Sequence, residues 1–164
     1  MDGVTQSQII SSDYQRADCA IGIVHLGFGA FHRAHQAVYI DEYMAKTNDL
    51  AWGIAAINLR NTESEAFALV ADEIAQHDGY LLKSVSPDNQ VHYTKIRSHI
   101  AFSDWAKNNK EAEALVSQPS VKAITITGTE SGYYTNPQGD LDLEHPVIAA
   151  ELQSDSKQSV YAFL

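Results

Sequence analysis

Two hydrophobic patterns alternate along the chain and predict an α/β fold. Continuous apolar runs rich in β-branched residues occur at residues 21–26, 52–59 and 121–127, as expected for strands buried on both faces of a parallel sheet. Segments that read as helices occur at residues 31–46, 63–75 and 104–116. This alternation predicts a Rossmann-type, mostly parallel sheet covered by helices.

A shorter pattern predicts a β-hairpin inserted into this frame. Strand-like segments at residues 80–85 and 91–93 are separated by Pro87-Asp88-Asn89, which is typical of a turn. Thr62 and Glu65 have the spacing of a capping box before the helix at 63–75, and Ser103 is a candidate cap for the helix at 104–116. Residues 1–20 are mostly polar and are expected to form a flexible leader.

Charge and composition exclude several classes of function. The formal net charge of −10 disfavours nucleic acid and anionic membrane surfaces as partners. Cys19 is the only cysteine, so no disulfide can form within the chain. The sequence has neither a secretory signal nor an apolar stretch long enough to cross a bilayer. We expect a cytoplasmic protein.

The most informative segment joins the first predicted strand to the first helix. Gly27 allows a tight turn, and Gly29, which has no Cβ, allows backbone N–H groups to approach a pyrophosphate closely. The helix that follows directs its N-terminal N–H groups and its dipole toward such an anion. The generic G-x-G-x-x-G motif has a third glycine where this chain has His32. Two other interpretations fit a strand followed by a glycine turn: a turn that binds no ligand, and a binding site for S-adenosylmethionine.

The residues around the glycines resemble one family closely. Gly-Phe-Gly-Ala-Phe-His-Arg-Ala-His-Gln at residues 27–36 is similar to the signature of the mannitol dehydrogenase family, the long-chain polyol dehydrogenases. That family also has histidine in place of the third glycine. Residues 52–61, 84–87, 93–100 and 125–134 resemble later segments of the family, with Gly128 and Thr129 as an apparent small insertion.

The resemblance implies an NAD-dependent dehydrogenase that moves a hydride between a sugar alcohol such as D-arabinitol and its ketose. Mannitol 2-dehydrogenase and fructuronate (hexuronate) reductase activities are the alternatives. Members of the family continue well beyond the length of this chain, into a helical domain that holds the catalytic lysine. Residues 21–164 are therefore expected to be an incomplete, C-terminally truncated Rossmann domain that is inactive alone and prone to self-association. A non-catalytic nucleotide-binding fragment is a further alternative.

The candidate site residues come from three strand ends. The resemblance implies that Glu130 matches the family's glutamate near the nicotinamide, which assists proton movement. The alternative is a loop glutamate that caps a turn. Arg60 has three possible roles. It binds the 2′-phosphate of NADP, which would make NADP an alternative cofactor; it stacks on adenine; or it is a solvated cation near Glu63. The expected cofactor contacts are Gly27, Phe28, Gly29, Ala30, Phe31, His32, Arg33, Asn58, Arg60 and Thr127.

Two of these residues have a competing interpretation. His32 either reaches the cofactor or packs under the loop, and Arg33 either contacts the pyrophosphate or lies exposed. His32 and His35 are three residues apart, a spacing that permits shared metal ligation, but no H-E-x-x-H motif accompanies them. We expect no metal.

Overall fold

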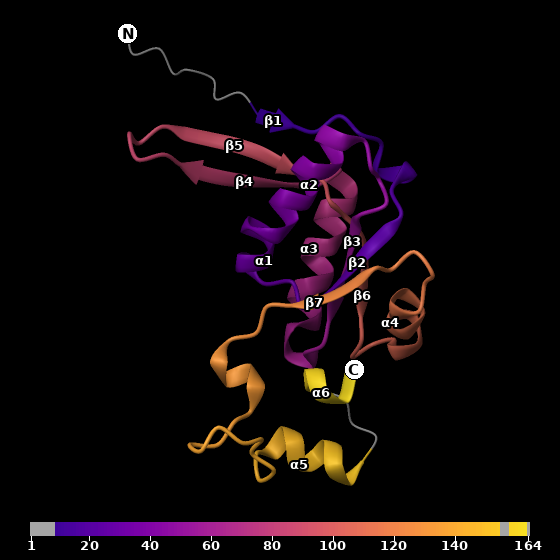
Figure 1. The fold of residues 1–164 in the computed structure, drawn as a ribbon, viewed down its shortest axis with the longest axis vertical. Helices are drawn as coiled ribbons and strands as arrows, with labels where there is room; N and C mark the ends of the chain where they lie inside the picture. The colour runs from indigo at the N-terminus through magenta and orange to yellow at the C-terminus, as the bar shows by residue number, and fades with distance from the viewer. Residues whose placement is uncertain (1–8, 155–157, 164) are drawn as a thin grey trace.

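A parallel four-stranded sheet forms the centre of the fold (Figure 1). The structure is a computed structural model that describes residues 9–154 and 158–163, without the side chains of residues 61, 130 and 131. The sheet has the strand order β6-β3-β2-β7. Its strands are β2 (Ile21–Leu26), β3 (Gly53–Asn58), β6 (His99–Asp104) and β7 (Ala123–Ile126). This is the order of the first four strands of a Rossmann fold.

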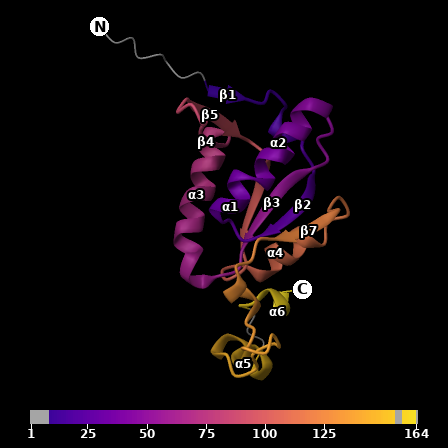
Figure 2. The same ribbon diagram turned by 60° about the vertical axis from the view of Figure 1, so that its left-hand side comes forward.

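Helices cover both faces of this sheet, and Figure 2 shows α3 and α4 with strands β2 and β3 between them. Val24, Leu26, Ala55 and Ile57 point to one face and pack against Trp105 and α4. Ile23 and Ile54 point to the other face and pack against Ala37 of α2. The helices are α1 (Ala30–Ala34), α2 (Gln36–Thr47), α3 (Ser64–His77), α4 (Asn109–Val116), α5 (Pro146–Gln153) and α6 (Val160–Phe163). None of the helices in the described ranges is long and apolar enough to cross a membrane.

A second, three-stranded sheet lies at the end of the molecule away from α5 and α6 (Figure 1). It contains the predicted hairpin, β4 (Tyr80–Val85) and β5 (Val91–Ile96), paired antiparallel. The short strand β1 (Ile9–Ser11) pairs parallel with β5. The hairpin insertion is therefore confirmed, and it is one strand wider than the sequence indicated.

Residues 9–20, expected to belong to a flexible leader, are built into the fold. The buried carboxylate of Asp41 on α2 holds this segment: its Oδ1 accepts hydrogen bonds from Tyr14 Oη at 2.5 Å and from the Arg97 backbone N–H at 2.8 Å. Arg97 also donates to the Ser12 carbonyl at 2.8 Å. The polar composition that suggested a leader supplies these hydrogen bonds instead. Residues 1–8 of the expected leader lie outside the described residues.

Three local predictions were wrong, for identifiable reasons. Ser103 and Asp104 end the edge strand β6 instead of starting a helix; α4 begins later, where Asn108 Oδ1 accepts from the Glu111 N–H at 3.2 Å. The capping box at Thr62 is not formed, because a 3₁₀ turn (Asn61–Glu63) precedes α3 and no side chain caps that helix. The predicted helix at 31–46 is two helices that break at His35 (φ −127°, ψ −81°).

Candidate functional site

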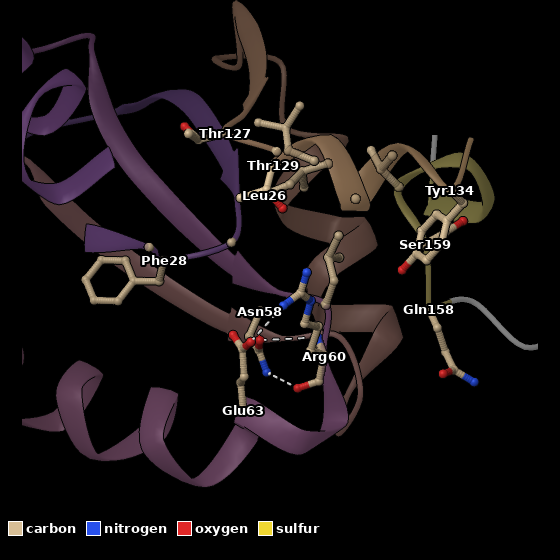
Figure 3. A pocket seen from close by; sticks show the side chains of 17 residues that line it. Leu26, Phe28, Asn58, Arg60, Glu63, Thr127, Thr129, Tyr134, Gln158 and Ser159 are labelled. Atoms are coloured by element: carbon tan, nitrogen blue, oxygen red, sulfur yellow. Dashed lines mark hydrogen bonds and ion pairs between the residues drawn. The ribbon is translucent and has the colours of Figure 1, made fainter. Parts of the chain in front are cut away.

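A cleft of about 270 Å³ lies beyond the carboxyl ends of β2, β3 and β7. This is the edge of an open α/β sheet where ligands bind. Figure 3 shows the cleft between the glycine loop, the residues after β3 and the segment that leads to α6. It is lined by Leu26, Gly27, Phe28, Gly29, Asn58, Leu59, Arg60, Glu63, Ile126, Thr127, Gly128, Thr129, Gly132, Tyr134, Gln158, Ser159 and Val160.

The two glycines of the loop have different roles. Gly27 has φ +98°, a conformation that favours glycine, and its N–H donates to the Ile57 carbonyl at 2.7 Å, which ties the turn to β3. Gly29 has φ −68° and precedes α1. A Cβ placed on Gly29 would meet no atom within 4 Å. The loop therefore leaves open space in front of the first N–H groups of α1, which have no partner within the helix.

The end of β3 forms the second wall of the cleft. Asn58 is buried; its Nδ2 donates to the Arg60 carbonyl at 2.9 Å and to Asp104 Oδ1 at 3.2 Å, while its Oδ1 accepts from the Arg60 N–H at 3.2 Å. Arg60 Nη1 lies 3.1 Å from Glu63 Oε1, and both side chains are more than half exposed (Figure 3). Asn58 thus uses its amide to shape the loop, and the charged pair of Arg60 and Glu63 lines the cleft.

The third wall joins the end of β7 to the C-terminal segment. Thr127 and Thr129 follow β7, and Tyr134 lies beyond the 3₁₀ turn Glu130–Tyr133. Ser159 is buried and its hydroxyl donates to Glu151 Oε2 at 2.6 Å, which fixes the approach to α6. Neither Tyr134 nor Ser159 was among the expected site residues. Tyr134 ends the segment 125–134 that resembles the family, whereas no motif marks Ser159, which reaches the cleft only through chain folding. The Glu130 side chain is outside the described part of the structure.

His32 lies beneath the loop, in a buried cluster of polar side chains. Its ring stacks on that of His25 from β2, with centroids 3.5 Å apart and planes 8° apart. Its Nε2 lies 2.9 Å from His99 Nε2, and its Nδ1 lies 3.0 Å from Gln36 Oε1. His25 Nδ1 in turn lies 2.8 Å from Thr125 Oγ1. His32 therefore packs beneath the loop, which was the second of its two predicted alternatives. It is not among the residues that line the cleft.

The three histidines are neutral at ordinary pH. Burial, with the neighbouring His32, lowers the pKa of His25 to about 3. Burial also lowers the pKa of His32 to about 4, against the opposing effect of its hydrogen bond to Gln36. Burial lowers the pKa of His99 well below its ordinary value in the same way, and His32, His25, Arg33 and Arg16 add to the shift. Uncharged imidazole rings can stack and form hydrogen bonds with one another without electrostatic repulsion.

The remaining residues of the signature surround the loop. The guanidinium carbon of Arg33 lies 5.1 Å from the centre of the Phe28 ring, and both residues line a second cavity of about 270 Å³ beside the cleft. Ala30 begins α1. Phe31 is 63% exposed and stacks on His35. The structure thus brings Gly27, Phe28, Gly29, Asn58, Arg60 and Thr127 together at the cleft, but not Ala30, Phe31, His32 or Arg33.

The strand order and the cleft at the carboxyl ends define a Rossmann-type α/β domain. A family profile described as the mannitol dehydrogenase Rossmann domain matches residues 21–163. The chain therefore belongs to the mannitol dehydrogenase family, whose oxidoreductase members include the relatives described next.

Two relatives and one solved structure show the extent of the similarity. The D-arabinitol 4-dehydrogenase of Klebsiella pneumoniae is 36% identical over 141 residues, which are 86% of this chain and 30% of that protein. The mannitol 2-dehydrogenase of Phaeosphaeria nodorum is 34% identical over 92% of this chain and 26% of its own length. The structure of Pseudomonas fluorescens mannitol 2-dehydrogenase in ternary complex with NAD and D-mannitol superposes with a TM-score of 0.82 at 27% identity, covering 94% of this chain and 31% of that one. The chain thus spans less than a third of the length of these proteins.

Proposed function

We propose that this chain is the NAD-binding portion of a polyol dehydrogenase. One observation carries the proposal: the glycine loop and the first turn of α1 open onto a cleft at the carboxyl ends of the strands, with free space in front of Gly29. A Cβ at that position would fill the space that a pyrophosphate needs for close approach to the backbone. The residues present therefore fit a dinucleotide.

Each wall of the cleft has a part in holding the cofactor. The N–H groups that follow Gly29 would bind the pyrophosphate, with the positive charge of Arg33 nearby. Arg60 and Glu63 lie where the adenosine ribose is recognised in Rossmann domains, after the second strand of the parallel sheet. Thr127, at the end of β7, would contact the cofactor further along the cleft. The bound cofactor supplies hydride transfer, and the protein supplies orientation.

D-arabinitol and its ketose are the substrate pair we propose for the whole protein. Similarity to D-arabinitol 4-dehydrogenases from two bacteria, at 36% and 31% identity, supports this choice, and similarity to mannitol 2-dehydrogenases supports mannitol as the alternative. We further propose Glu130 as the group that assists proton movement, because it follows β7 at the ligand-binding edge of the sheet. A cytoplasmic location stays a prediction.

Calorimetric titration of the purified chain with NADH tests the proposed function. Saturable binding with one site per chain is the expected result. The matched variant is Gly29→Ala, whose methyl group meets no protein atom and whose backbone stays unstrained, so its melting temperature should equal that of the unmodified protein. Its affinity for NADH should fall about tenfold or more, because the methyl group occupies the pyrophosphate position. No binding by folded wild-type chain, or equal binding by Gly29→Ala, would overturn the proposal.

A further inference from the structure

The third glycine of the generic motif serves close packing between helix and strand, and this chain solves that packing problem differently. His32 occupies the position of the third glycine and places its flat ring between α1 and β2, stacked on the ring of His25. The ring of His99, from β6, meets His32 nearly edge-on, at 79° between planes. Helix α1, which follows the glycine loop, therefore packs against β2 and β6 through imidazole rings.

The side chain of Gln36 determines which nitrogens of these rings carry protons. The Thr125 hydroxyl donates to Gln36 Oε1 at 3.3 Å, so the hydrogen of that hydroxyl is used and His25 Nδ1 must donate to Thr125. Gln36 Oε1 can only accept, so His32 Nδ1 also carries a hydrogen. Because neutral His32 then has a bare Nε2, the hydrogen between the two rings belongs to His99 Nε2. His99 Nδ1 is left bare, and it has no hydrogen-bond partner among the described residues.

We infer that Gln36, by fixing these tautomers through one carbonyl oxygen, positions His32 and thereby the glycine loop for dinucleotide binding. This inference rests on the proposed function. Gln36 is a positioning residue, because it lies below the loop and does not line the cleft.

The cluster contacts the loop at two points. His32 belongs to α1 itself, one turn after Gly29. The ring of Phe28, between the two glycines, packs edge-on against His99 with centroids 4.9 Å apart. A change in the His32–His99 hydrogen bond is therefore expected to move the loop at Phe28 and at the start of α1.

The charged and titratable groups that face the cluster come from neighbouring elements. Arg33 of α1 lies beside it, and Arg16 Nη2 donates to the His99 carbonyl at 2.6 Å. The ring of Tyr80 from β4 lies 5.9 Å from that of His99. The two arginines oppose protonation of His99, and burial holds Tyr80 in its neutral form by raising its pKa. The network therefore keeps neutral histidines in one defined arrangement.

Two substitutions of Gln36 separate positioning from simple packing. Gln36→Leu keeps the approximate volume but removes the acceptor, and we expect its Kd for NADH to rise about tenfold. Gln36→Glu keeps an oxygen that accepts from both donors, and at about pH 8 its affinity should stay within about threefold of wild type. Gln76→Leu, on the exposed side of α3, is the matched control and should leave the affinity unchanged.

Nitrogen-15 NMR of the imidazole rings gives a readout that packing alone would not change. Wild-type protein should show Nδ1–H tautomers at His25 and His32 and an Nε2–H tautomer at His99, with or without NADH. Gln36→Leu should lose the Nδ1–H preference at His32, and Gln36→Glu should keep it.

The outcomes distinguish the inference from the proposed function. An Nε2–H tautomer at His32 in wild type would overturn the inference, as would unchanged NADH affinity in folded Gln36→Leu. If Gln36→Leu does not fold, Gln36→Glu decides: a folded protein with affinity reduced about tenfold would overturn the inference. Wild-type protein that shows the expected tautomers but binds no NADH would refute the proposed function, and with it the positioning role, while leaving the tautomer assignment in place.

Discussion

The imidazole rings of His25 and His32 lie parallel in the interior, 3.5 Å apart between centroids, and each is 1% exposed. Burial lowers their pKa values to about 3 and about 4, whereas in the unfolded chain both titrate near 6.5. Between these values the unfolded state binds protons that the folded state does not. Stability is therefore full above about pH 6.5 and should fall as pH decreases toward 4, by about 1.4 kcal/mol for each histidine and pH unit.

Urea unfolding at several pH values between about 4.5 and 7.5 measures this dependence. Most of this range lies above the titration of carboxyl groups. Among them is Asp78, whose pKa is lowered: burial acts to raise it, but the hydrogen bonds from Arg97 and Arg16 outweigh that effect. In the His32→Asn variant, the loss of unfolding free energy per pH unit should be smaller by the contribution of one histidine. An unchanged slope in that variant would show that His32 does not titrate as its burial requires.

Glu63 should control the choice between NAD and NADP. Its carboxylate pairs with Arg60 at the cleft and adds a negative charge that a 2′-phosphate would meet. Glu63→Gln frees the guanidinium and should raise the affinity for NADPH relative to NADH about five- to tenfold, measured by calorimetry at fixed salt. Stability should change little, because both partners are more than half exposed. Glu65→Gln, also exposed, is the control, and a similar shift there would assign the effect to net charge alone.

Asn58 should be important for stability as well as for the shape of the cleft. Asn58→Leu removes the donor to the Arg60 carbonyl and to Asp104, and the acceptor for the Arg60 N–H. Leaving these groups unpaired should cost about 2–4 kcal/mol of unfolding free energy, measured in urea. Asn109→Leu, at an exposed position in α4, should cost less than about 0.5 kcal/mol. A similar small loss at Asn58 would mean that water replaces its hydrogen bonds.

The edge strand β7 should promote association between chains. Ile124 and Ile126 pair with the buried residues Val24 and Leu26 of β2, yet are 41% and 44% exposed. Replacing both isoleucines with lysine should reduce association, because charges on an edge strand oppose pairing. Sedimentation velocity over a range of concentrations measures the effect. Leu69→Lys, at an exposed site on α3, serves as the control, and equal behaviour of all three proteins would contradict a role for this edge.

Local patterns predicted the parts of the fold that local interactions determine. The strand at residues 21–26 and the hairpin strand at 80–85 have the predicted bounds, because continuous or bounded apolar runs specify them directly. Strand β6 was missed because Ser103-Asp104 reads as a helix start, although the pairing of β6 with β3 makes it a strand. The break at His35 has no glycine or proline to signal it.

The glycine loop of the cleft could be predicted because backbone geometry requires glycine there. Gly27 has a positive φ and Gly29 faces open space. Packing of His32 beneath the loop was one of its two predicted alternatives, but its partner His99 could not be predicted from that segment, since it lies on a strand 67 residues later. Ser159 also reaches the cleft only through the folded chain, where Glu151 holds it in place.

The carboxylate of Asp41 has a consequence for how the molecule opens. It accepts hydrogen bonds from Tyr14, before β2, and from Arg97, just after the hairpin. Neither the inserted sheet nor the N-terminal segment can detach without breaking bonds to α2 of the main frame. Their amide hydrogens should accordingly exchange with solvent through the same cooperative opening as those of the central strands, so that the insertion and the frame behave as one unit of unfolding.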